Sequence, residues 1–140
     1  MKKLLILLLP VLFAGQWLAA QTPAVKLDTL PNGETIFKMV ETQPAFKGGQ
    51  KAWIDFLQKN LQYPPAAIDN ELQGTVMTDF IIDKDGKISD IKIVKSPGKA
   101  LSEEATRIIK LSDGNWLPGT QNGQKVKCHM HEPIVFKLSK

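Results

Sequence analysis

The chain has 140 residues, of which 43% are hydrophobic and 23% charged, as expected for one globular domain and not for a disordered chain. The formal net charge of +4 falls to +2 without Lys2 and Lys3 of the leading segment. This balance argues against a nucleic-acid partner, which normally requires a concentrated basic stripe. Cys128 is the single cysteine, so an internal disulfide is excluded and core packing must hold the domain together.

The first twenty residues have the order of a secretory signal peptide. Two lysines precede an apolar run at residues 4–14, and Leu18 and the small residues Ala19 and Ala20 follow. We expect cleavage before Gln21 and export of the mature chain. The alternative is an uncleaved inner-membrane anchor, for which residues 4–20 are at the short limit of a membrane span. The predicted organisation is a signal peptide at 1–20, an amino-terminal segment with a short strand at 21–44, and a folded domain at 45–140.

The folded part opens with a turn and a helix. Pro31 and Gly33 form a turn before residues 35–40, which predicts either a small leading hairpin or a single added strand. Gly48 and Gly49 precede a helix whose apolar stripe consists of Trp53, Phe56, Leu57 and Leu61. Pro64 and Pro65 end this helix and allow a short turn through residues 66–68.

A long β-hairpin is predicted over residues 72–97. Val76, Phe80 and Ile82 share one face of its first arm, with the period of a half-buried strand. The segment Asp83–Gly86 forms the turn. In the second arm, the alternation places Ile91 and Ile93 on one face and Ile88 on the other.

A second helix and a last strand complete the chain. Ser102 is the expected helix cap, with Glu103 and Glu104 in the first turn. The buried stripe of this helix comprises Leu101, Ala105, Ile108 and Ile109, and Gly114 ends it. A loop at 115–125 then leads into a strongly alternating strand.

In the last strand, one face carries Val126, Cys128, Met130, Ile134, Phe136 and Leu138, and Glu132 alone breaks this apolar row. The opposite face carries Lys127, His129, His131, Val135 and Lys137. Pro133 cannot donate to a ladder, which predicts an edge position or a bulge. The fold class is therefore α+β, an antiparallel sheet made of the central hairpin and the carboxyl-terminal strand, with two helices packed on it.

The residues do not indicate an enzyme, a metal site or a cofactor. Asp83, Asp85 and Gly86 lack the spacing and flanking helices of a calcium loop. His129 and His131 lie on one strand face, which is half of a tetrahedral zinc site. A metal-binding protein that uses both histidines is kept as an alternative. Cys128 points to the opposite face from the histidines beside it, so it cannot pair with them as a nucleophile.

Several motifs occur together in an order and spacing that resemble a known family, the carboxyl-terminal domain of TonB energy transducers in its Bacteroidetes form. The resemblance covers about Thr35 to Leu138. It rests on Pro44–Gly49, Tyr63-Pro64, Gly74, the hairpin FIIDKDGKISDIKIVKS, Ser102–Ala105, Trp116–Gly119, Asn122-Gly123 and Pro133–Phe136.

The resemblance implies a periplasmic, non-enzymatic module that binds a peptide segment of a TonB-dependent outer-membrane transporter, or of another envelope protein, by β-strand addition to the last strand. The partner contacts that it implies are Gln62, Tyr63, Lys127, His129, His131 and Val135. A short membrane-anchored energy transducer is the alternative within this family. An exposed edge strand would also permit a homodimer.

Overall fold

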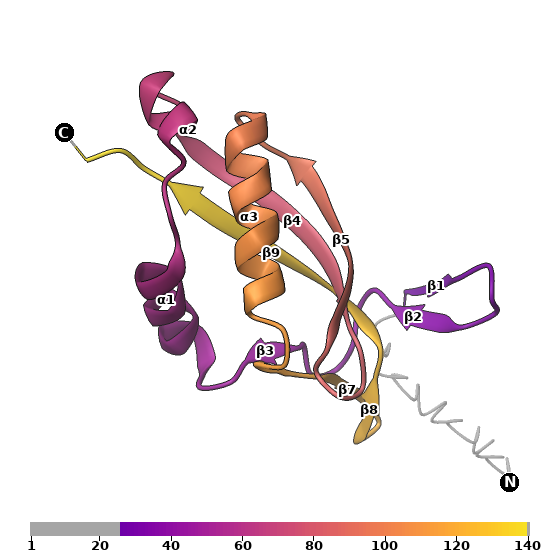
Figure 1. The fold of residues 1–140 in the computed structure, drawn as a ribbon. Coiled ribbons are helices and arrows are strands. Elements are labelled where there is room, and N and C mark those ends of the chain that lie inside the picture. Colours follow the sequence, from indigo (N-terminus) through magenta and orange to yellow (C-terminus); the bar gives the residue numbers. More distant parts are fainter. Residues whose placement is uncertain (1–25, 140) are drawn as a thin grey trace, which may run out of the picture.

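The fold is built on a five-stranded sheet with the strand order β1-β2-β9-β4-β5, in a computed structural model that describes residues 26–139 (Figure 1). The strands are β1 (Leu27–Thr29), β2 (Thr35–Phe37), β9 (Cys128–Phe136), β4 (Gly74–Ile82) and β5 (Ile88–Lys95). The expected signal peptide at 1–20 and its cleavage site lie outside the described residues. Within the described part, no helix has the length and apolar character needed to cross a membrane.

The central element of the sheet is the antiparallel pair β4 and β9. Their ladder is continuous from Gly74 opposite Phe136 to Ile82 opposite Cys128. Val76, Phe80 and Ile82 of β4 are fully buried, as are Ile134 and nearly all of Phe136 in β9. The predicted alternation of both strands and the α+β fold class are confirmed.

The second arm of the hairpin differs from the prediction. Its pairing with β4 shifts register between Asp79 and Ile81, and Asp90 has a positive φ of 50°. Ile88 packs against the core together with Ile91 and Ile93. Placing Ile88 on the opposite face was therefore wrong, because a β-bulge inserts one residue and breaks the two-residue period between positions 88 and 91.

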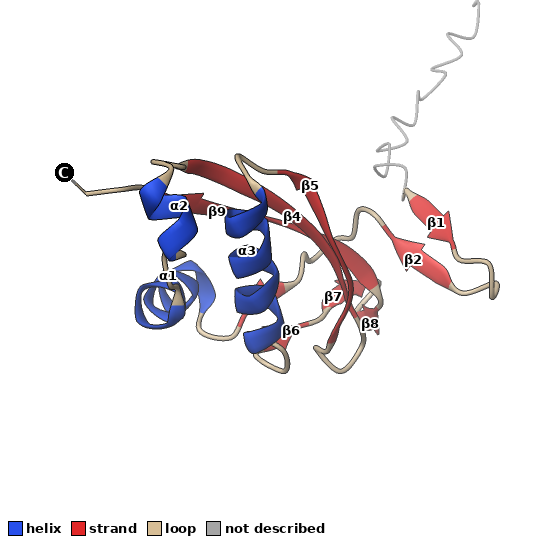
Figure 2. Ribbon diagram, turned by 45° about the horizontal axis from the view of Figure 1, so that its top comes forward, coloured by secondary structure: helices blue, strands red, loops and turns tan. Residues whose placement is uncertain are grey.

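Helices cover one face of the sheet, as Figure 2 shows. They are α1 (Gly49–Asn60), α2 (Pro65–Asp69) and α3 (Lys99–Leu111). The predicted buried stripe of α3 is confirmed, since Leu101, Ala105, Ile108 and Ile109 are fully buried. The residues predicted as a turn at 66–68 form the short helix α2.

The prediction that Ser102 caps the second helix was wrong. The helix α3 begins directly after Gly98, four residues earlier than expected, so Ser102 lies inside it and the first turn holds no acidic residue. The Ser102 hydroxyl donates instead to the Gly98 carbonyl, four residues back, at 3.2 Å. The start of the helix packs closely against Leu72, because a Cβ atom at position 98 would lie 2.8 Å from the Leu72 side chain. Glycine, which has no Cβ, is therefore suited to this position.

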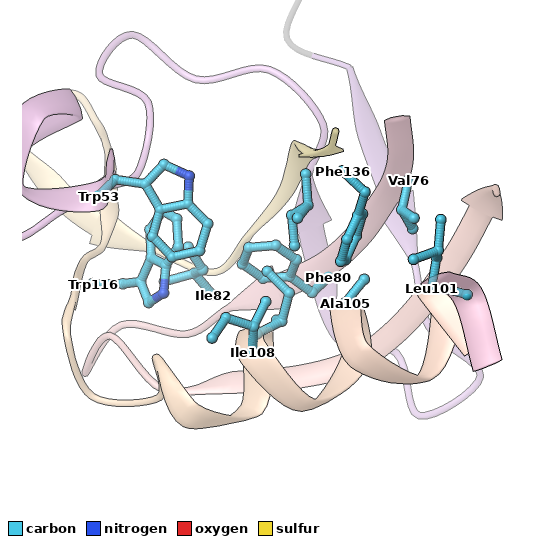
Figure 3. Close-up of a cluster of buried hydrophobic side chains, with 12 residues drawn as sticks. Trp53, Val76, Phe80, Ile82, Leu101, Ala105, Ile108, Trp116 and Phe136 are labelled. Carbon is cyan, nitrogen blue, oxygen red and sulfur yellow. The ribbon is translucent and has the colours of Figure 1, made fainter. Parts of the chain in front are cut away.

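Aromatic side chains fill the space between α1, α3 and the sheet (Figure 3). The ring centroid of Trp116 lies 5.3 Å from that of Trp53 and 5.4 Å from that of Phe80. The loop expected at 115–125 contains three short strands, namely β6 (Trp116–Leu117), β7 (Gly119–Gln121) and β8 (Gln124–Val126). Since β6 pairs with β3 (Ala45–Phe46), Trp116 is fixed as a core residue.

A buried carboxylate on α3 holds the connection between α1 and α2. Glu104 is 7% exposed, and its Oε1 accepts a hydrogen bond of 2.7 Å from the Gln62 backbone N–H. Arg107 donates to both carboxylate oxygens of Glu104, at 2.6 and 2.8 Å, and to the Asn60 carbonyl at 2.7 Å. Burial by itself would raise the pKa of Glu104, but the hydrogen bonds from Arg107 and Gln62 outweigh it and the pKa is lowered.

This arrangement predicts a pH-dependent loss of stability in Glu104→Gln. A lowered carboxyl pKa stabilises the fold above the ordinary value of 4.5, and this contribution is lost as the pH falls through the folded-state value. We expect Glu104→Gln to lower the free energy of unfolding by about 1–2 kcal/mol at pH 7, and by less at pH 3.5. Urea unfolding at both pH values measures the difference. The control is Glu103→Gln, because the exposed Glu103 carboxylate forms a single ion pair within residues 26–139, with the exposed Lys99 at 3.8 Å.

A second prediction concerns the stability effect of replacing Gly86 in the hairpin turn. This residue has a φ of +80°, and a Cβ atom there would lie 2.1 Å from the Trp116 carbonyl oxygen. Gly123 has a similar φ of +74° with no atom within 4 Å, so it is a matched control. Thermal or urea unfolding should show a cost of about 1 kcal/mol for Gly123→Ala from backbone strain alone. Gly86→Ala should cost about 1–3 kcal/mol more, and equal costs would contradict the close packing of this turn on Trp116.

Candidate functional site: the open edge of the last strand

The strand β9 is covered on one side and largely open on the other. The strand β2 runs parallel to β9 and pairs with it only where Phe37 lies opposite Cys128, and the Phe37 N–H donates to the Lys127 carbonyl at 3.0 Å. Beyond this point no strand in residues 26–139 pairs with that side of β9, and Figure 1 shows its carboxyl-terminal half running free of β2. The edge position predicted from Pro133 therefore holds for the second half of β9 and not for its start.

The direction of the main-chain groups follows from the same contact. Backbone N–H and C=O groups of successive residues in a strand point to opposite edges, and the Lys127 carbonyl points toward β2. The N–H and C=O groups of His131 and Val135, and the C=O of Pro133, are therefore directed to the open edge. The N–H that Pro133 lacks would have faced this edge, so the proline leaves the ladder with β4 intact.

A groove lies between this edge and α1. Its volume is about 480 Å³. The lining residues are Gln50, Trp53, Ile54, Leu57, Gln58 and Leu61 from α1, with Glu132, Pro133 and Val135 from β9. The side chains of Ile54 and Val135 are 44% and 62% exposed, so the groove presents apolar surface beside unpaired backbone groups.

Glu132 is the charged residue in this groove. Its side chain belongs to the inward-facing row of β9 and is 8% exposed. Burial raises the pKa of the Glu132 carboxyl, which the facing Trp53 side chain opposes in part. None of the ion pairs formed within residues 26–139 includes Glu132. Every other residue of its row is apolar, so the row itself offers the carboxylate no polar partner.

Gln62 and Tyr63, two of the expected contacts, lie near the carboxyl end of β9. The Tyr63 ring packs edge-on against Phe136, with centroids 5.7 Å apart, and its hydroxyl donates to the Leu72 carbonyl. The Gln62 side chain is exposed, whereas its backbone is held by Glu104. Both residues are thus fixed in place beside the open edge.

The other four expected contacts are divided along β9. Lys127 pairs with Glu34 at 3.0 Å beside β2, and His129 Nδ1 lies 3.3 Å from Asp79 Oδ1. These two side chains are engaged within the molecule. His131 and Val135 are exposed at the open part of the strand, although His131 Nδ1 also lies 3.5 Å from Asp79 Oδ1. The structure therefore brings His131, Val135 and the Gln62–Tyr63 segment to one edge, and leaves Lys127 and His129 at the covered start.

Neither a metal site nor a nucleophile emerges from the described residues. His129 and His131 flank Asp79, with nearly parallel rings whose centroids are 6.4 Å apart. Across residues 26–139, no group of three or more His, Cys, Asp or Glu side chains could hold a metal ion. Burial raises the pKa of the Cys128 thiol to about 11, which leaves it protonated and unreactive at neutral pH.

Sequence reasoning missed the α1 side of this site. The stripe that predicted the helix was limited to Trp53, Phe56, Leu57 and Leu61 and was assigned to the core, so the prediction did not connect Gln50, Ile54 and Gln58 with β9. Two signals were present in the sequence. Ile54 is an apolar residue at the border of the stripe, on the side of Leu57 and Leu61, and Glu132 is a charge in an apolar row.

Comparison with known structures found similar solved domains. Two solution NMR structures of the carboxyl-terminal domain of Helicobacter pylori TonB are similar to this chain, each with 26% sequence identity and a TM-score of 0.49. The alignments cover 62% of this chain and 78% of a longer fragment, and 64% of this chain and 94% of a shorter one. No curated protein matches the sequence.

The family assignment rests on the sequence model for the carboxyl-terminal region of the Gram-negative bacterial TonB protein. That model matches residues 59–138, which is more than half of the chain and includes α2, α3 and every strand from β4 to β9. The chain therefore belongs to the family of Gram-negative bacterial TonB carboxyl-terminal domains.

Proposed function

We propose that this domain binds an extended segment of a TonB-dependent outer-membrane transporter, or of another envelope protein, by adding it as a strand to β9 in the periplasm. The observation that carries the proposal is the unpaired edge of β9 from His131 to Phe136. Exposed backbone donors and acceptors in a row are a template for strand addition. Membership of the TonB carboxyl-terminal family supports the same function.

The remaining edges of the sheet are less suited to this role. The strand β1 has only three residues, all exposed. In β5, the register shifts opposite β4 and the positive φ of Asp90 interrupt the regular spacing of backbone groups. Lys92 and Lys95 are also exposed on β5. Bulges and lysines of this kind discourage pairing, which favours β9 as the binding edge.

Main-chain pairing at β9 also sets an expectation for the strength of binding. The N–H groups of His131 and Val135 are the two donors at the open edge, because Pro133 between them has none. An added strand would therefore leave one of its own carbonyls without a backbone donor. Each additional hydrogen bond contributes about 1 kcal/mol, so the proline keeps the complex weaker and more readily reversible than a full ladder would be.

Backbone substitutions on the open edge test this proposal. Val135→Pro removes an outward donor and should weaken binding about fivefold or more, whereas Pro133→Ala supplies the missing donor and should strengthen it about fivefold. Val135→Thr is the matched control, since it changes the side chain and keeps the N–H. The measurement is fluorescence anisotropy with a labelled peptide from the periplasmic amino-terminal segment of a TonB-dependent transporter of the same organism.

Chemical shift mapping with the same peptide locates the bound segment. Strand addition should move the amide signals of His131 and Val135 most strongly. Unchanged affinity in both Val135→Pro and Pro133→Ala would contradict pairing at this edge, as would shifts confined to β5.

A further inference from the structure

We propose that Glu132 is a specificity-determining residue of the groove, and that it selects a lysine or arginine at the position of the bound segment directly opposite it. The occupant is thus an extended segment with one inward-facing basic residue between inward-facing apolar residues. This inference rests on the proposed strand addition at β9 and specifies which segments it accepts.

Strand pairing determines which side chain meets Glu132. Residues directly opposite each other on paired strands place their side chains on the same face, with Cβ atoms ~5 Å apart. Glu132 faces the helical layer and not the exposed outer face that carries His131 and Val135. The residue opposite Glu132 must therefore also point inward, into the groove between β9 and α1.

The charge balance of the groove determines what that residue should be. Glu132 is the one ionisable side chain among the residues that line it, and Gln50 and Gln58 are neutral. A buried carboxyl with no ion-pair partner is unfavourable, and covering it with an apolar segment would remove it further from water. A cation brought in by the segment would instead satisfy the carboxylate with a charge-assisted hydrogen bond.

The apolar wall of the groove accounts for the rest of the pattern. The inward-facing residue on the Ile134 side of the basic one would lie beside Leu57 and Leu61 of α1. The inward-facing residue on the Met130 side would lie beside Pro44 and Ala45, which are apolar as well. Lysine and arginine also suit such a place, because their aliphatic stems pack on apolar surface while the charged end reaches its partner. The pattern predicted for the segment is therefore apolar, any residue, basic, any residue, apolar.

Selection from a displayed library of random twelve-residue peptides tests the inference with the folded domain. The wild-type domain should enrich peptides that carry lysine or arginine at one position of an alternating pattern, and Glu132→Val should enrich an apolar residue there. Glu132→Gln keeps the shape of the side chain and should lose the preference for a basic residue. Urea unfolding of each variant is the folding control. We expect neither to be less stable than the wild type, because each removes a buried carboxyl without an ion-pair partner.

A matched pair of peptides then gives the fold-change. One selected peptide is made with lysine and with norleucine, which keeps the aliphatic stem and lacks the charge. The wild type should bind the lysine form about tenfold more tightly, a ratio that should fall to about one in Glu132→Gln and reverse in Glu132→Val. A carboxyl ¹³C titration should show a lower pKa for Glu132 with the lysine form bound than with the norleucine form.

The outcomes separate this inference from the proposed function. Equal affinity of the two peptides for the wild type, with shifts at the His131 and Val135 amides, would overturn the role of Glu132 and leave strand addition standing. If no selected peptide shifts those amides, strand addition at β9 fails and the inference fails with it. Self-association through β9 that no peptide displaces would overturn both in favour of a homodimer.

Discussion

The hydrogen-bonding requirement of one strand governs the arrangement of this domain. The nine residues of β9 pair with β4 throughout, which directs the main-chain groups of every second residue away from the sheet. The strand β2 covers this edge only at the start of β9, where the Phe37 N–H donates to the carbonyl of Lys127, the residue just before the strand. From His131 onward these groups lie at the open edge beside the groove, so the same ladder that builds the core also creates the unpaired edge.

An unpaired strand edge can bind a partner, but it can also pair with the wrong strand or with a second copy of the protein. Two residues of β9 oppose such unwanted pairing. Pro133 removes a donor from the middle of the edge, and Glu132 places an inward-facing charge beside it. Both features are common means by which proteins discourage unwanted strand pairing. Two copies of β9 that paired with each other would bury two such carboxyls. A partner segment that supplies a cation meets no such penalty, so one residue can oppose self-association and favour the correct ligand.

The parts that sequence could predict are those fixed by local periodicity. The alternation of β4 and β9 and the stripe of α3 gave correct strands, faces and fold class, because burial on one face imposes a two-residue or 3.6-residue period. Ile88 was misplaced because a bulge at Asp90 resets the period, and Ser102 was taken for a cap although the helix starts at Lys99. The groove depends on α1 and β9 meeting across about 75 residues of sequence, and no local pattern encodes that contact.

The residues near the open edge differ in what they must give up before they can contact a bound partner. Arg107 and Glu104 hold the backbone at Gln62, and Tyr63 is fixed by Phe136 and the Leu72 carbonyl, so a ligand that touches this segment needs to order little of the protein. Lys127 and His129 would have to give up Glu34 and Asp79 before they could bind a partner. Recognition should therefore be concentrated between His131 and Phe136, where the main chain is unpaired, the groove is preformed and Glu132 has no partner of opposite charge among the described residues.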